Sequence, residues 1–337
     1  MRGRAAFMNK KVLKLIVLPL GFVLLWFIQQ ELLVYGLRNY TTGNLGVWGR
    51  VMKGKVNAEI LFCGSSRTWI HFDPAIFEAC TGKRAFNIGR NGTLPDLQLA
   101  FLKAYLRHNT KPDVIIQGMD IGMLQGTAQI YNPSQYIAYL DEPELYEKVS
   151  SIDRWFILYK RLPLIGILRT SALGSAFQGL RGNCEKENLK AGYSAQEVPW
   201  RLDFDSYKAA HPFGVTVQVT SAGSQAVRGI LELCKEKGIP VVLVYPPEYI
   251  ENQALTLNRA EVFKNFEEMA AEYGVPFWNY SDHPLCSEKR CFYNSQHLNA
   301  DGATQFSQDC GKRLAEYLAG AGKGGKLGVV SSRPDGE

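Results

Sequence analysis

The chain has 337 residues, of which 46% are hydrophobic, and its formal net charge is +6. This length and apolar content suffice to fill a buried core, so we expect a folded protein with one large domain or two small ones. The modest charge, without a zinc-type or nucleic-acid motif, argues against a nucleic-acid-binding protein. None of the seven cysteines forms a pair at two-residue spacing, which argues against a metal knuckle or a redox site. We therefore expect no metal and no cofactor.

The first 34 residues predict a membrane anchor. Five basic residues precede an uncharged apolar run from Leu15 to Ile28, and the residues just before the run extend it toward the ~20 that a bilayer core requires. A cleaved signal peptide is the alternative, but bulky residues follow the run where a small-x-small cleavage site would stand. The basic flank predicts a cytoplasmic tail over 1–11 and a transmembrane helix over 12–34, which places the remainder on the outer side of the membrane.

A repeating pattern of strands and helices follows a glycine-containing juxtamembrane connector at 35–57. Such alternation implies a parallel sheet with helices on both faces, in one α/β domain over 58–318. The expected strands are Ile60–Cys63, Arg84–Ile88, Asp113–Gln117, Pro240–Tyr245 and Val275–Tyr280, and the expected helices are Pro95–Arg107, Ser224–Lys237, Asn258–Tyr273 and Asp301–Leu318. The tail at 319–337 is rich in Gly, Ser and Lys and is predicted to be disordered.

A large insertion at 121–220 interrupts the alternation. Its apolar and basic stretch, Asp153 to Phe177, suits a lid, a surface that rests on lipid headgroups or a membrane partner, or a helical hairpin packed on the core. Further along the chain, Cys286 and Cys291 bracket a short polar loop, and they are either a disulfide of an oxidising compartment or two free thiols. Because seven is odd, at least one thiol has no partner within the chain.

Two short polar motifs suggest chemistry. The first predicted strand runs directly into Gly64-Ser65-Ser66-Arg67, and ligands of open α/β sheets bind just beyond the carboxyl ends of the strands. A serine there is a candidate nucleophile, although the two serines are also good caps for a following helix. At the far end of the domain, Asn294-Ser295-Gln296-His297 precedes the terminal helix. Of the five histidines only His297 has a functional context, because His71, His211 and His283 fall in polar loops without an identifiable partner.

Taken together, these motifs resemble the SGNH/GDSL hydrolase superfamily. Within it they are similar to the membrane-anchored members that act beside a membrane-bound O-acyltransferase, such as the DltD proteins of teichoic-acid D-alanylation and the alginate acetylation proteins. The resemblance covers 58–120 and 221–318. It implies a flavodoxin-like doubly wound parallel sheet, to which this chain adds the N-terminal helix and the insertion.

The resemblance assigns the nucleophile and the oxyanion donors. Ser66 occupies the position of the family's nucleophilic serine, and its backbone N–H and that of Gly92 would donate to the oxyanion. Asp120 stands where the family has an asparagine donor, and an ionised carboxylate cannot donate. Either the oxyanion hole relies on Ser66 and Gly92, or Asp120 is protonated or paired with Arg67. Arg67 and Asn91 are the expected substrate-binding residues, with a structural ion pair as the alternative for Arg67.

The family's last motif, Asp-x-x-His, is altered. His297 has the place of the catalytic base, and Asn294 replaces the acid at the same spacing. An asparagine oxygen can accept the ring N–H and orient the imidazole, but it supplies no negative charge. Asp282 and Asp301 are other candidates for the acid, although neither has the family spacing.

The expected function is therefore a membrane-anchored serine esterase or O-acyltransferase. The resemblance implies acyl transfer, of acetyl in the first place, to a cell-envelope polysaccharide or glycopolymer, with the membrane, a glycan acceptor and a membrane-bound O-acyltransferase as partners. The alternative is a catalytically impaired descendant that binds a glycan or supports such an acyltransferase. A third possibility is a secreted lipase-like esterase, released by signal cleavage.

Overall fold

The computed structural model of the chain describes residues 10–182, 189–201 and 203–321. Its centre is a five-stranded sheet in which every neighbouring pair is parallel. The strands are β1 (Ile60–Cys63), β2 (Ala85–Asn87), β3 (Val114–Gly118), β6 (Val241–Tyr245) and β7 (Phe277–Asn279). Their spatial order, β2-β1-β3-β6-β7, is the flavodoxin-like order. In this order β2 is added on one side of β1, and all later strands are added on the other side, beginning with β3. The predicted fold class is confirmed.

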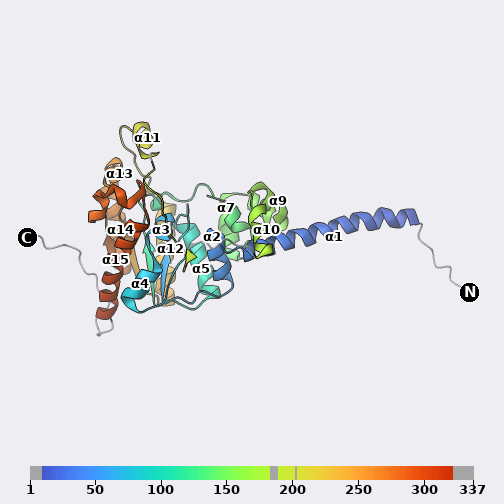
Figure 1. The fold of residues 1–337 in the computed structure, drawn as a ribbon, viewed down its shortest axis with the longest axis horizontal. Coiled ribbons are helices and arrows are strands. Elements are labelled where there is room, and N and C mark those ends of the chain that lie inside the picture. Colours follow the sequence, from blue (N-terminus) through green and yellow to red (C-terminus); the bar gives the residue numbers. More distant parts are fainter. Residues whose placement is uncertain (1–9, 183–188, 202, 322–337) are drawn as a thin grey trace, which may run out of the picture.

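Helices cover both faces of the sheet (Figure 1). Alternate residues of β1 show why, because Leu61 faces one apolar cluster and Phe62 the other, and both are fully buried. The first face carries α5 (Pro95–His108), α12 (Ser221–Lys237) and α14 (Arg259–Tyr273), and the second carries α3 (Ser66–His71), α4 (Pro74–Thr81) and α15 (Ala300–Ala321). Loops at the carboxyl edge of the sheet add α11 (Asp203–Ala210), α13 (Ile250–Leu255) and the two-stranded pairs β4 (Leu189–Lys190) with β5 (Tyr193–Ser194) and β8 (Phe292–Asn294) with β9 (His297–Leu298).

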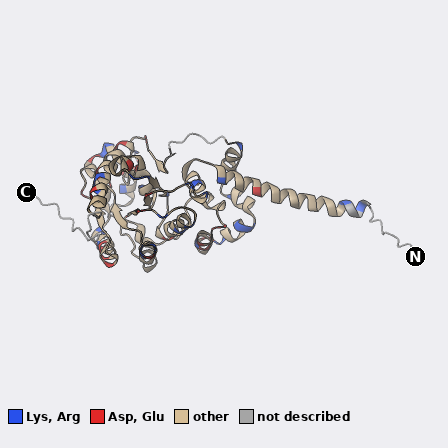
Figure 2. Ribbon diagram, turned by 90° about the horizontal axis from the view of Figure 1, so that it is seen from below, with Lys and Arg blue, Asp and Glu red and all other residues tan. Residues whose placement is uncertain are grey.

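The N-terminal helix α1 (Lys10–Asn39) has two parts with different surroundings. Its stretch from Lys14 to Asn39 is long and apolar enough to cross a membrane, and its first two thirds project from the domain (Figures 1 and 2). Its last turns are buried in the domain, where Leu33, Val34 and Leu37 have exposed fractions of 3%, 7% and 0%. Of the predicted cytoplasmic tail at 1–11, residues 1–9 lie outside the described residues, and Lys10 begins α1. Of the tail at 319–337, residues 319–321 were wrongly predicted to be disordered because they continue α15, and 322–337 lie outside the described residues.

The predicted connector at 35–57 is not a simple linker. It contains the end of α1 and a second helix, α2 (Gly43–Met52), whose Trp48 is 1% exposed and packs against Phe101 and Tyr139. Spaced glycines suggested a flexible segment, but at Gly46 and Gly49 a side chain would collide with the backbone of Thr41 and Arg38. These glycines therefore serve close packing.

The insertion forms a third apolar core together with α1, α2 and α5. The part of the insertion that joins this core is more than the helical hairpin that was one alternative from the sequence, because five short helices build it. They are α6 (Ser134–Ile137), α7 (Pro143–Ile152), α8 (Trp155–Arg161), α9 (Pro163–Arg169) and α10 (Leu173–Arg181). Phe156 and Ile167 of the predicted surface stretch are fully buried, whereas Trp155 is 45% exposed.

Cys286 and Cys291 are free thiols, both buried. The pairing that remained open for them is thus absent from this structure, and Cys184 lies outside the described residues.

Candidate active site

The turn between β1 and α3 gives Ser65 and Ser66 different tasks. Gly64 makes the turn with φ of 150°, and a side chain there would collide with the Thr68 hydroxyl. Ser65 is the N-cap of α3, because its Oγ accepts the Arg67 backbone N–H at 3.2 Å. Capping therefore needs only Ser65. The side chain of Ser66, the first residue of the helix, is left for other contacts.

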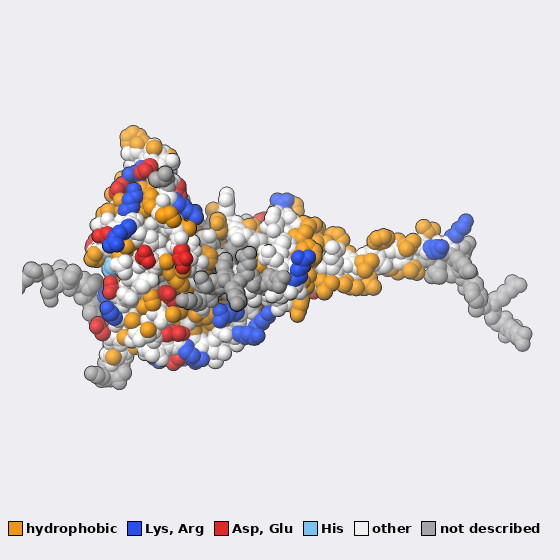
Figure 3. Space-filling model, in the orientation of Figure 1, with side chains coloured by type: hydrophobic (Ala, Val, Ile, Leu, Met, Phe, Trp, Pro, Cys, Tyr) orange, Lys and Arg blue, Asp and Glu red, His pale blue; other side chains and the backbone are white. Residues whose placement is uncertain are grey.

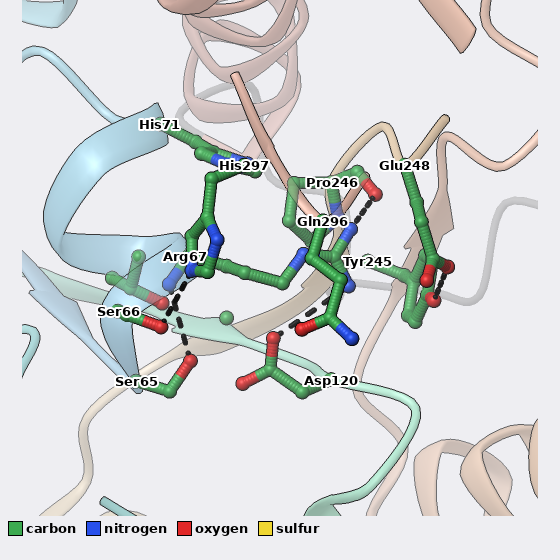
Figure 4. A network of polar contacts seen from close by, with 12 residues as sticks. Ser65, Ser66, Arg67, His71, Asp120, Tyr245, Pro246, Glu248, Gln296 and His297 are labelled. Carbon is green, nitrogen blue, oxygen red and sulfur yellow. Dashed lines mark hydrogen bonds and ion pairs between the residues drawn. The ribbon is translucent and has the colours of Figure 1, made fainter. Parts of the chain in front are cut away.

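Ser66 and His297 meet across the site although 231 positions separate them in the sequence. Ser66 Oγ lies 2.8 Å from His297 Nε2 (Figure 4). His297 Nδ1 lies 3.0 Å from Asn294 Oδ1. The Asn294 oxygen also accepts the backbone N–H groups of Gln296 and His297 at 3.0 and 2.9 Å, which identifies it as an acceptor. His297 Nδ1 must then carry the ring proton, so the lone pair of Nε2 faces the Ser66 hydroxyl. Asp282 and Asp301, the other candidates for the acid, do not make this contact.

The imidazole of His297 is held in its neutral form. Burial, followed by the repulsion of the Arg67 cation, lowers the pKa of His297 to about 3. A neutral imidazole is the form that can accept a proton from a serine hydroxyl. The same environment disfavours the protonated imidazolium, because no carboxylate among the described residues contacts the ring.

His71 supports the loop that carries His297. This residue is fully buried at the end of α3, and its Nε2 accepts the backbone N–H of Leu298 at 3.0 Å. Its ring stands edge-on to that of His297, with 6.1 Å between centroids. Burial, the Arg67 cation and His297 together keep the pKa of His71 well below its usual range. The sequence interpretation of His71 as a loop residue without a partner was wrong, because the contact spans 227 positions and leaves no local signal.

Gly92 lies in a loop beside Ser66, and both residues line one cleft. Gly92 adopts a φ of +66°, and a side chain there would collide with the ring of Tyr131. Arg90 fixes the start of this loop, because its buried guanidinium stacks on Trp48 and Phe101. Asn91 contacts the Tyr131 hydroxyl at 3.4 Å and does not line this cleft.

Asp120 follows β3 and lies beside Arg67. Its Oδ1 is 3.6 Å from Arg67 Nη1, so the pairing expected as one alternative is present. Burial raises the pKa of Asp120, and the Arg67 cation and the Ser65 hydroxyl oppose that rise. Asp120 lines the same cleft as Ser66 and Gly92.

The guanidinium of Arg67 is fixed from several sides. It donates to the carbonyl oxygens of Pro246 and Pro247 at 2.6 and 3.0 Å, and it lies 4.6 Å from the centroid of the Tyr245 ring (Figure 4). Burial alone would lower the pKa of Arg67, but Tyr245, Glu248 and Asp120 together raise it. These contacts are those of a structural ion pair, and they leave only Arg67 Nε without a partner among the described residues.

Glu248 anchors this polar network, and the sequence analysis missed it. Its carboxylate, in a residue that is 1% exposed, accepts from the Tyr245 hydroxyl at 2.5 Å, Asn252 Nδ2 at 2.5 Å and Arg259 Nη1 at 3.0 Å. The sequence did contain one indication of its position. Glu248 follows the carboxyl end of β6, and Ser66 and Asp120 follow the carboxyl ends of β1 and β3 at the same edge of the sheet.

The cleft beside Ser66 has a volume of about 390 Å³, and polar side chains such as Gln125, Glu248 and Asn252 line it together with Val215 and Leu255. A second hollow of about 270 Å³ adjoins Asn294 and Ser295, and Tyr207 and Gln296 line both spaces. Among the described residues, no group of three or more His, Cys, Asp or Glu side chains is placed to hold a metal ion.

Neither a protein-family model nor a curated protein matches the sequence. Among solved structures, a protein of Streptococcus pneumonia provisionally described as a platelet activating factor is similar at 15% identity and a TM-score of 0.38, over 90% of this chain and 99% of that one. A protein of Bacteroides fragilis NCTC 9343 provisionally described as an acylhydrolase is similar at 10% identity and a TM-score of 0.35, over 78% of this chain and 89% of that one. These scores are too low to bear on the chemistry of the site.

Proposed function

We propose that this protein is a membrane-anchored serine esterase or O-acyltransferase of the SGNH type, with Ser66 as nucleophile and His297 as base. The observation that carries the proposal is the 2.8 Å contact between Ser66 Oγ and His297 Nε2, with the ring oriented by Asn294. A serine at a strand end, a neutral imidazole beside it and an acceptor behind the imidazole are the parts that nucleophilic acyl transfer requires.

The reaction then proceeds in two halves. Ser66 Oγ attacks the carbonyl carbon of an acyl ester while its proton passes to His297 Nε2, and Asn294 Oδ1 retains the proton on Nδ1. The backbone N–H groups of Ser66 and Gly92 donate to the oxyanion of the tetrahedral intermediate. Its collapse leaves the acyl group on Ser66, and the departing alcohol takes the proton from His297. In the second half His297 removes a proton from the acceptor hydroxyl as it attacks the carbonyl carbon of the acyl-serine. The bond between that carbon and Ser66 Oγ then breaks, and Ser66 Oγ takes the proton back from His297.

The acceptor and the location complete the proposal. A hydroxyl of a cell-envelope polysaccharide or glycopolymer receives the acyl group, most simply acetyl, or water receives it and the reaction is hydrolysis. The basic flank before α1 remains in the cytoplasm and the domain faces outward. A membrane-bound O-acyltransferase as acyl donor fits this arrangement.

Two observations favour a second candidate, a catalytically impaired domain that binds a glycan or supports an acyltransferase. Asn294 gives the imidazolium no compensating charge, and Asp120 brings a carboxyl group to the cleft where an oxyanion donor is needed. Turnover separates the two candidates.

The test is hydrolysis of p-nitrophenyl acetate by the full chain in detergent. We expect slow turnover that Ser66→Ala and His297→Ala each reduce by at least ~10²-fold, because each removes a partner in the proton transfer. Ser65→Ala is the matched control, and it should retain turnover because Ser65 caps α3 and interacts with Asp120, whereas the contact with His297 is made by Ser66. Equal rates in the wild-type protein and all three variants would favour the binding role.

A further inference from the structure

The length of α1 places the domain directly against the membrane surface. Side chains from Lys14 to Gln29 have no cover from the domain apart from partly covered Gly21, whereas Gln30 is already 2% exposed. The helix from Lys10 to Gln29 is therefore about 30 Å long at 1.5 Å per residue, which is about the thickness of the hydrocarbon core. No helical spacer remains between a spanning segment and the folded domain.

Helices α9 and α10 lie at the place where α1 enters the domain. The contact with α10 is close, because a side chain at Gly36 would collide with the Ala176 carbonyl and one at Gly179 with the Gly36 carbonyl. This crossing fixes the insertion against the part of α1 that leaves the bilayer. On α1 itself Leu32 and Tyr35 remain 52% and 62% exposed at the same level.

The helices α8 to α10 present apolar side chains around this point instead of burying them. Figure 3 shows hydrophobic side chains gathered where the projecting helix meets the domain, with basic side chains beside them. The exposed apolar residues of the three helices are Trp155, Ile157, Leu168, Phe177 and Leu180, with exposed fractions between 37% and 54%.

The charge of the same segment is entirely positive. Residues 154–181 contain Arg154, Lys160, Arg161, Arg169 and Arg181, all exposed, and no Asp or Glu. Arg169 stacks on the exposed ring of Trp155 at 4.1 Å from its centroid, so cationic and apolar groups share one surface. Apolar side chains interspersed with Lys and Arg, without acids, are typical of surfaces that lie at the boundary between headgroups and acyl chains.

We infer that residues 154–181 form a membrane-seated collar, in which α8 to α10 rest in the headgroup region of the leaflet from which α1 emerges. Three independent observations carry this assignment: the length of free α1, the continuity of the exposed apolar side chains with that helix, and the five basic side chains of 154–181 in the absence of any Asp or Glu within these residues. The occupant is the lipid surface, and anionic headgroups would pair with the five basic side chains. Two attachments, the helix and the collar, hold the domain in one orientation, whereas a single helix would let it swing.

Trp fluorescence in nanodiscs tests the collar with the full chain. Phe177→Trp adds a reporter on α10, and Phe213→Trp adds one at a residue that is 89% exposed in the loop after α11, away from α1. Both variants and the wild-type protein are reconstituted with phosphatidylcholine and phosphatidylglycerol, with or without bromine on the acyl chains near the headgroup. Quenching of Trp26, measured in a Trp155→Phe background so that the collar does not contribute, verifies insertion.

We expect brominated lipid to quench most of the emission that Phe177→Trp adds and almost none of the emission that Phe213→Trp adds. Equal quenching of the two reporters, or an unquenched reporter at 177 while Trp26 is quenched, would overturn the collar. An unquenched reporter at 177 would mean that solvent, rather than lipid, covers α8 to α10 in the nanodisc. Because the reporters do not touch Ser66 or His297, the outcome is independent of the proposed activity.

Discussion

The residues on the two sides of Ser66 differ in charge: those on one side are neutral and those on the other are ionisable. On one side, His297 and Asn294 form a neutral pair in which an amide oxygen occupies the position of a triad carboxylate. On the other side lie charged groups with little exposure: Arg67 is paired with Asp120, and Glu248 is paired with Arg259. The site therefore does not lack carboxylates. They lie beside Ser66 rather than behind the ring of His297.

This difference has a chemical consequence. The nearest cation, Arg67, adds to burial in lowering the pKa of His297, and no anion behind the ring opposes it. A base of this kind is always available to accept a proton but holds it weakly. The arrangement is consistent with slow turnover of simple esters and with a reaction that depends on a bound acceptor or partner.

Arg67→Met should have the largest effect on stability. It leaves Asp120 without its cation, while Glu248 keeps its ion pair with Arg259, and removing one partner from a buried ion pair typically costs 3–5 kcal/mol, about the loss expected here in the free energy of unfolding. Arg67→Lys is the control, since it keeps the charge but not the two-nitrogen fork, and it should lose less. Denaturant unfolding of the full chain in detergent, followed by Trp fluorescence, measures both. Equal losses would show that packing on Tyr245, rather than charge, is what matters.

Asn294→Asp should raise activity. A carboxylate at this position can accept from Nδ1 and stabilise the imidazolium, so we expect turnover of p-nitrophenyl acetate to rise roughly 10- to 100-fold, part of the ~10⁴ that the reverse change removes from a full triad. The acid limb of the pH–rate profile should also move upward, because the pKa of His297 rises. Ser295→Asp is the matched control, and it adds the same charge one residue away. A rise in both variants would indicate a general charge effect.

Low pH should destabilise the fold through its buried histidines. His71 and His297 are neutral in the folded protein because their pKa values are lowered, whereas the unfolded chain takes up protons near pH 6.5. Their contribution is fully present above that pH and is lost as the pH falls, by about 2 kcal/mol per histidine at pH 5. Unfolding measured at pH 7 and pH 5 should show this loss, and His71→Gln should reduce it. An equal loss in the wild-type protein and in His71→Gln would contradict this account.

Ser65→Ala should have the smallest effect. It removes the N-cap of α3 and should cost about 1 kcal/mol of stability, with turnover retained. Thermal unfolding and the esterase assay on the same sample would show the division of labour between the two serines. Loss of turnover with unchanged stability would instead place Ser65 in the chemistry.

The strands and long helices of the domain could be predicted because their signals are local. The predicted strand Ile60–Cys63 is β1 residue for residue, and the later strands and helices all appear in the expected order. Helix α12 begins three residues before the predicted start because Thr220 caps it by accepting the Gly223 N–H, a cap that the sequence analysis overlooked. Periodicity reports burial within an element, and it performs well where a sheet has two covered faces.

The rest depends on contacts between distant segments. Ser66 and His297 were matched to their positions by a family motif, and their proximity could not be calculated from spacing. The support of the His297 loop by His71 and the anchoring of Arg67 near Glu248 have no local pattern. Helix α2 looked like a linker because glycines that permit close packing and glycines that permit flexibility are identical in the sequence.

The most direct test of the central claim is intact mass spectrometry of the full chain after exposure to a fluorophosphonate, which reacts with nucleophilic serines. We predict a single adduct, located on Ser66 by peptide mapping, present in Ser65→Ala and absent from both Ser66→Ala and His297→Ala. An unmodified protein that is folded, or an adduct that persists when Ser66 is replaced, would contradict the account.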